Sequence, residues 1–177
     1  MSAKNVLKPS DGHPVTVPTQ DMVLGVYYLT TVKEGGKGEW KIFRDIDEAK
    51  TAYFSDIIGL HSRIKVRMTK EVDGKTYSDI VETTVGRLIF NEIIPQDLGF
   101  CDRSKDENKV LPEVDYLVGK KQLADIIEAC IKIHGKDVTS RVLDNIKALG
   151  FEYSTKGAIT ISISDIVVPP QKKELIK

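Results

Sequence analysis

The sequence has few of the residues that mark a disulfide-bonded, metal-bound or membrane-embedded protein. It contains two cysteines and three histidines in 177 residues, and Cys101 and Cys130 form no Cys-x-x-Cys pair. We therefore expect two reduced thiols rather than a disulfide or a zinc site. No apolar run approaches the roughly 18 residues of a membrane span, and the first residues lack the apolar stretch of a secretory signal. These absences predict a cytoplasmic protein with no membrane attachment.

The chain also lacks an excess of charge of either sign. Its 26 Lys and Arg residues balance 26 Asp and Glu residues, so the formal net charge is zero. A balanced charge disfavours a dedicated nucleic-acid binder that works by neutralising phosphates. Because 41% of the residues are hydrophobic, the chain can build a core, and its length suits a single domain over residues 1–177.

No local motif identifies a catalytic site. The glycines of residues 35–38 make neither a GxGxxG nor a Walker pattern. None of His13, His61 and His134 has a second histidine at i+3 or i+4, so the local spacing of zinc ligands is missing. No GxSxG sequence marks a nucleophilic serine. A small hydrolase that uses Asp or His stays open as an alternative, and it requires titratable groups that converge in one cleft.

The first part of the chain predicts an extended arm followed by a helix. Residues 1–18 contain three prolines, which favour extended backbone. Thr19 is the expected N-cap of a helix that runs to Thr30. Gly25 lies inside this helix, where it costs stability relative to alanine and permits a close backbone approach.

Short strands and two capped helices follow. Residues 40–43 alternate as a strand, and Asp45 with Glu48 resembles a capping box for a helix to Phe54. Residues 62–83 predict an antiparallel hairpin, with a type I′ turn at its Asp-Gly pair. A further helix over 85–93 is predicted by the preceding threonine cap.

The second half predicts a surface loop and a helical hairpin. Residues 97–115 show no clear period and are expected to form a long loop. The pattern of residues 121–149 predicts two helices joined at Gly135, and Gly150 is expected to follow the end of the second helix. Residues 158–163 alternate as a strand. Together these patterns predict an α+β fold with short antiparallel strands and a helical hairpin.

Five blocks of sequence resemble beta-prime, the largest subunit of bacterial RNA polymerase, in the stretch that follows its catalytic magnesium loop. The blocks are KNVLKPSDGHPVTVPTQDMVLGVYYLT (4–30), GLHSRIKVR (59–67), VETTVGRLIFNEIIP (81–95), IKALGFEYST (146–155) and GAITISISDIVVPPQKKELI (157–176). They occur in one order and cover essentially the whole chain.

The resemblance implies a pore-type domain in the wall of the secondary channel. Through this channel nucleoside triphosphates enter during transcription and the 3′ end of backtracked RNA leaves. Residues 169–177 would begin the first rim helix of the channel. The implied partners are the rest of beta-prime, the other polymerase subunits, nucleoside triphosphates, the RNA 3′ end and the cleavage factors that enter nearby.

The same resemblance limits the expected chemistry. The magnesium ligands of the polymerase are three aspartates that should lie upstream of this segment. We therefore expect no cofactor, no metal ligand and no catalytic residue in this chain, and no polymerase activity from the chain alone.

Three residues are candidates for the channel lining. Gln20 is implied to lie near the inner mouth, where its amide can donate to and accept from a passing phosphate. Lys120 and Lys121 match a basic pair beside the wall, where ammonium groups attract phosphates. The simpler explanation for Gln20 is a place in the first turn of its helix. The simpler explanation for Lys120 and Lys121 is a solvated pair beside a helix. Arg87 is expected to anchor its helix. A free-standing module that binds a protein partner through apolar residues of 15–28 is the alternative function.

Overall fold

The computed structural model describes residues 18–72 and 74–157. The predicted arm up to residue 17, the strand at 158–163 and the helix start at 169–177 lie outside these ranges, as does Asp73 of the predicted turn.

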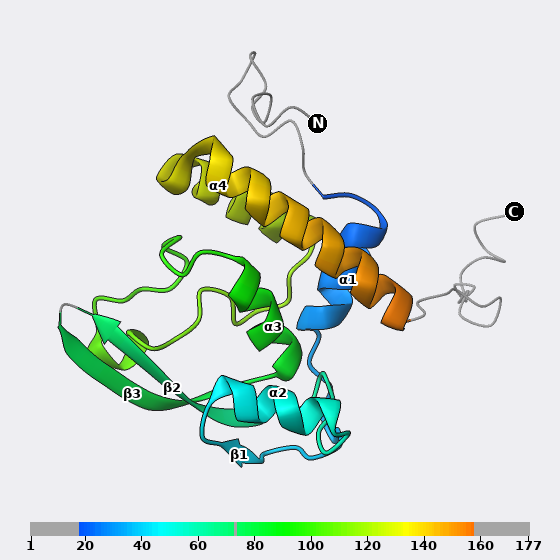
Figure 1. The fold of residues 1–177 in the computed structure, drawn as a ribbon, viewed down its shortest axis with the longest axis vertical. Coiled ribbons are helices and arrows are strands. Elements are labelled where there is room, and N and C mark those ends of the chain that lie inside the picture. Colours follow the sequence, from blue (N-terminus) through cyan, green and yellow to red (C-terminus); the bar gives the residue numbers. More distant parts are fainter. Residues whose placement is uncertain (1–17, 73, 158–177) are drawn as a thin grey trace, which may run out of the picture.

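The described residues form an α+β fold, as the sequence predicts (Figure 1). In Figure 1 the small sheet and α2 lie at one end of the molecule and α4 at the other, with α1 and α3 between them. The elements in chain order are α1 (Asp21–Thr30), β1 (Ile42–Phe43), α2 (Ile46–Phe54), β2 (Ile64–Val72), β3 (Lys75–Thr83), α3 (Val85–Ile93), the short 3-10 helix η1 (Asp106–Asn108) and α4 (Lys120–Gly157).

The sheet has the order β1-β2-β3, with β1 parallel and β3 antiparallel to β2. The hairpin is confirmed, since β2 and β3 pair from Ile64 opposite Thr83 to Val72 opposite Lys75. The first strand is shorter than predicted. Trp40 has a φ of 64°, which lies outside the extended region of regular strands, and only Ile42–Phe43 pairs with β2.

The predicted helix caps at α2 and α3 are confirmed. Asp45 Oδ1 accepts from the amide of Glu48 at 2.8 Å, and Glu48 Oε2 accepts from the amide of Arg44 at 2.6 Å. Thr84 Oγ1 accepts from the amide of Arg87 at 3.3 Å. The amides of Glu48 and Arg87 lie in the first turns of their helices, where amides have no partner within the helix.

The helical hairpin is confirmed, but its second helix is longer than predicted. Gly135, with φ of 75° and ψ of −173°, interrupts α4, and the two halves of the helix fold back on each other (Figure 1). The second half does not end at Gly150 but continues to Gly157. Gly150 has another role, which is to allow the backbone of α1 to approach.

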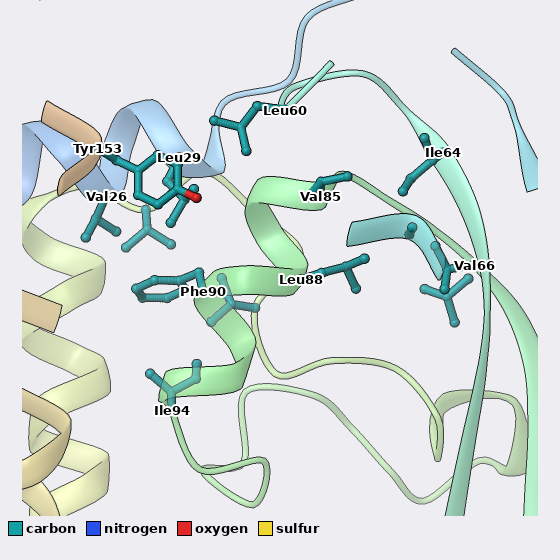
Figure 2. Close-up of a cluster of buried hydrophobic side chains, with 14 of the residues drawn as sticks. Val26, Leu29, Leu60, Ile64, Val66, Val85, Leu88, Phe90, Ile94 and Tyr153 are labelled. Atoms are coloured by element: carbon teal, nitrogen blue, oxygen red, sulfur yellow. The ribbon is translucent and has the colours of Figure 1, made fainter. Parts of the chain in front are cut away.

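The hydrophobic core is centred on α3, which packs on both sides. Figure 2 shows Phe90 pointing toward Val26 of α1 and Tyr153 of α4, whereas Leu88 points toward Val66 of β2. All five of these side chains are buried, and Phe90 and Val26 are 0% exposed. One core therefore joins the sheet to the helical end of the molecule.

Helix α1 packs closely against α4 and α3, and each of the two contacts is made at a glycine. A Cβ atom built on Gly25 would overlap the carbonyl oxygen of Gly150 in α4. One built on Gly86, at the start of α3, would overlap the carbonyl oxygen of Leu29. The close approach expected at Gly25 is confirmed, and its partner is the glycine predicted to end a helix.

The segment 97–115 is not the surface loop that its composition predicts. Leu98, Val110 and Val114 are buried with exposures of 6%, 6% and 0%. The amide side chain of Asn91 pairs with the backbone of Val114, donating to its carbonyl at 2.7 Å and accepting from its N–H at 3.0 Å. The prediction is wrong because polar side chains, which carry no periodic signal, hold this loop on the core.

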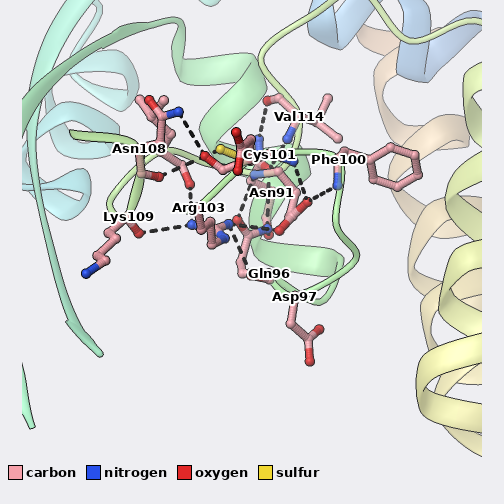
Figure 3. Close-up of polar contacts among 12 residues, drawn as sticks. Asn91, Gln96, Asp97, Phe100, Cys101, Arg103, Asn108, Lys109 and Val114 are labelled. Atoms are coloured by element: carbon pink, nitrogen blue, oxygen red, sulfur yellow. Dashed lines mark hydrogen bonds and ion pairs between the residues drawn. The ribbon is translucent and has the colours of Figure 1, made fainter. Parts of the chain in front are cut away.

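A buried ion pair closes the same loop (Figure 3). The carboxylate of Glu113, whose side chain is fully buried, lies 2.9 Å from Arg103 Nη2 and also accepts from the amide of Phe100 at 2.8 Å. Arg103 Nη1 donates to the carbonyls of Lys109 and Leu111 at 3.0 and 2.9 Å. These bonds offset part of the cost of burying the charges, although Arg103 Nε is buried without a partner in the described part of the chain.

We predict that Gly25→Ala lowers the free energy of unfolding by about 2 kcal/mol or more, because the added methyl forces α1 away from α4. Chemical denaturation followed by circular dichroism measures this change. Gly119→Ala is the matched control, since the nearest atom to its added Cβ is the flexible Gln122 Oε1 at 3.2 Å. Equal losses in the two variants would contradict the close packing of α1 on α4.

Candidate functional site at the two ends of helix α1

Gln20 occupies the N-cap position of α1, one residue later than predicted. Its backbone has φ of 50° and ψ of −121°, and its side chain makes no capping hydrogen bond. The amide of Met22 donates to the carbonyl of Thr19 at 3.2 Å, so a tight turn rather than a threonine cap starts the helix. The side chain of Gln20 is exposed. A non-glycine residue in this conformation costs on the order of 1–3 kcal/mol.

Lys120 and Lys121 are the first two residues of α4, and both are exposed. The first turn of α4 contains no acidic residue. Because the N-terminal end of a helix carries a partial positive charge, two lysines there disfavour the helix and together favour a nearby anion.

The two parts of the candidate site lie at opposite ends of α1. Thr30, the last residue of α1, accepts through Oγ1 from the amide of Val118 at 3.0 Å, which places the start of α4 beside this end. Gln20 lies at the other end, and a helix of 10 residues spans about 15 Å. The structure therefore does not bring Gln20 and the lysine pair together at one point.

Arg87 anchors α3 to the end of α1 that lies near Lys120 and Lys121, as expected. Its Nε donates to the carbonyl of Thr30 at 3.2 Å, and its Nη1 donates to Asp115 Oδ1 at 2.8 Å. Burial raises the pKa of Asp115, and the ion pair with Arg87 opposes this rise. Arg87 is thus a structural anchor for α1, α3 and the segment before α4.

Two histidines have structural partners that the sequence does not reveal. His61 packs edge-on against Tyr28 with ring centroids 4.5 Å apart, and burial lowers its pKa. His134 Nε2 lies 2.6 Å from Asp97 Oδ1.

Thr30 is a further residue that sequence reasoning missed, because its partner Val118 lies 88 positions away and no local pattern links the two.

Neither cysteine resembles a nucleophile. Burial raises the pKa of both Cys101 and Cys130, which disfavours the reactive thiolate. Within the described ranges, no group of three His, Cys, Asp or Glu side chains could hold a metal ion. The helices of these ranges also include none that is long and apolar enough to cross a membrane.

Comparison with known proteins identifies the family to which this chain belongs. The family described as "RNA polymerase Rpb1, domain 3" matches residues 5–166. The chain therefore belongs to this family of RNA polymerase domains.

The relatives that it matches are subunits of bacterial enzymes. The chain is 60% identical over 176 residues to the "DNA-directed RNA polymerase subunit beta'" of Caldicellulosiruptor saccharolyticus, and 62% identical over 178 residues to that of Acetivibrio thermocellus. The subunit of Clostridium acetobutylicum is 59% identical over 176 residues. These alignments cover 99–100% of this chain and 15% of each relative. The resemblance to beta-prime is confirmed, and the chain spans a small part of the length of these relatives.

We predict that Gln20→Gly raises the free energy of unfolding by about 1 kcal/mol, because glycine adopts the positive φ of this position without strain. Thermal or urea unfolding measures the change. Thr19→Gly is the control, since it adds chain entropy without relieving a positive φ, and it should lower stability. A loss of stability in Gln20→Gly as large as that in the control would show that Gln20 is not strained.

Proposed function

We propose that this segment forms part of the wall of the secondary channel of a DNA-directed RNA polymerase and so serves RNA synthesis in the intact enzyme. The observation that carries the proposal is the match of 99% of the chain, at 60% identity, to a beta-prime subunit. In this role the segment guides nucleoside triphosphates toward the active centre and the 3′ end of backtracked RNA away from it.

The positions of the candidate residues support a guiding role. Gln20 offers an uncharged amide, which can exchange hydrogen bonds with a phosphate without retaining it. Lys120 and Lys121, about one length of α1 away, add positive potential from side chains and helix end. Two weak contacts spaced along a wall favour passage over tight binding.

In the proposed assembly the remaining part of beta-prime and the other polymerase subunits surround this segment. Cleavage factors that enter the channel would pass close to it. The described residues do not offer a suitable donor set for the catalytic magnesium of a polymerase. We therefore assign no catalytic step to them, and the upstream position of the magnesium ligands stays a prediction.

The alternative, a module that binds a protein partner, would use exposed apolar residues of α1. Leu24 and Tyr27 are 37% and 46% exposed. A polymerase segment would also present such residues to its neighbours in the complex. This surface therefore does not separate the two hypotheses, and the match over 99% of this chain to a beta-prime subunit favours the polymerase.

Photocrosslinking in an intact polymerase that carries this segment tests the channel role. A photoreactive amino acid replaces Gln20 or Lys121, and transcription complexes backtracked by different distances carry RNA labelled at its 3′ end. We expect the label to crosslink from position 20 at short backtracks and from position 121 once the RNA has moved about 15 Å further.

The same amino acid at Thr76, an exposed residue of β3 near the hairpin turn, is the control and should not reach the RNA. The channel role would be refuted by complexes that crosslink from none of the three positions. It would also be refuted by crosslinks that are equally strong from position 76.

A further inference from the structure

A cleft away from the candidate channel residues has the size of a small-molecule site. It lies between the start of α2, the edge of β2, the end of α3 and the loop after η1, and its volume is about 550 Å³. Such sites commonly span about 300–1,000 Å³. Its apolar lining includes Ile46, Met68, Leu88, Ile94, Val110 and Leu111.

A lysine in this cleft lacks a good partner for its charge. Lys70 continues the inward-facing positions of β2, whose preceding members are Ile64, Val66 and Met68. Its Nζ lies 3.4 Å from the carbonyl oxygen of Gln96, which is long for a charged donor. Burial and the nearby Arg103 lower the pKa of Lys70. The carboxylates that act on it, Glu113 and Asp97, have closer partners in Arg103 and His134.

The carboxylates that line the cleft already have cationic partners. Asp45 accepts from the amide of Glu48 and pairs with Arg44 at 3.0 Å. Asp47 and Glu92 lie 3.5 and 2.6 Å from the same ammonium, that of Lys50. The ammonium of Lys70 is therefore a positive charge in the cleft that has no close carboxylate partner among the described residues.

The edge of β2 adds a backbone donor. The amide of Lys65 donates to the carbonyl of Lys41 at 2.9 Å, so the odd-numbered amides of β2 point toward the side where β1 lies. Because β1 ends at Phe43, the amide of Thr69 points past its end toward the cleft, which Thr69 helps to line. Arg67, also in the lining, is exposed.

We propose that this cleft binds a small amphipathic anion, which has an aromatic or acyl body and one carboxylate, sulfonate or phosphate head. The body rests on the apolar floor, and the head pairs with the ammonium of Lys70 and the amide of Thr69. This site is independent of the channel role, since it contains none of the residues assigned to that role.

Two fluorescent probes test the proposal on the unaltered 177-residue chain. The anionic probe is anilinonaphthalene sulfonate, and the neutral probe is N-phenylnaphthylamine, which has the same aromatic body without the charged head. We expect one anionic probe to bind per chain, about tenfold more tightly than the neutral probe, because a charge-assisted pair contributes this much.

Variants of β2 then locate the anion. Lys70→Met should remove the tenfold preference, and Lys70→Arg should retain it. Lys65→Met, on the outer face of the same strand, is the matched control and should leave both affinities unchanged. Equal affinities of the two probes for the unaltered chain would overturn the proposal, as would equal losses in Lys70→Met and Lys65→Met. Circular dichroism of each variant confirms that its fold is intact.

Discussion

The arrangement of this domain depends on how closely helix α1 approaches its neighbours. Gly25 lies against Gly150 of α4, and Gly86 of α3 lies against the carbonyl of Leu29, with no space for a methyl group at either contact. Thr30 then accepts a hydrogen bond from the amide of Val118, just before α4. Because interiors are close-packed, these contacts fix the position of α1. They therefore also fix the separation between Gln20 and the lysine pair.

The loop between α3 and α4 is held by a different kind of interaction. Several of its apolar side chains pack on the core, and the ion pair of Arg103 with the fully buried Glu113 organises its backbone. The same loop supplies Val110 and Leu111 to one wall of the cleft beside β2. A polar network thus shapes an apolar surface, because it sets where the chain between the helices can lie.

The parts of the fold that could be predicted from sequence are those encoded by neighbouring residues. The cap at Asp45 involves partners within four positions, and the alternation of β2 reports its own buried face. Contacts between distant segments leave no such signal, so local patterns predict a helix end at Gly150 and a surface loop at residues 97–115. The candidate residues Gln20, Lys120 and Lys121 came from family resemblance. Their separation along α1 depends on a contact across 88 positions, which no local pattern encodes.

Native-state hydrogen exchange of the chain tests most directly whether α1 is clamped to α4. If the glycine contacts hold the two helices as one cooperative unit, the amides of Val26 and Leu29 should exchange with the same free energy as that of Ile146, within about 1 kcal/mol. Exchange of Val26 and Leu29 through a local opening several kcal/mol below that of Ile146 would show that α1 moves independently. It would then contradict the claim that packing of α1 sets the geometry of the site.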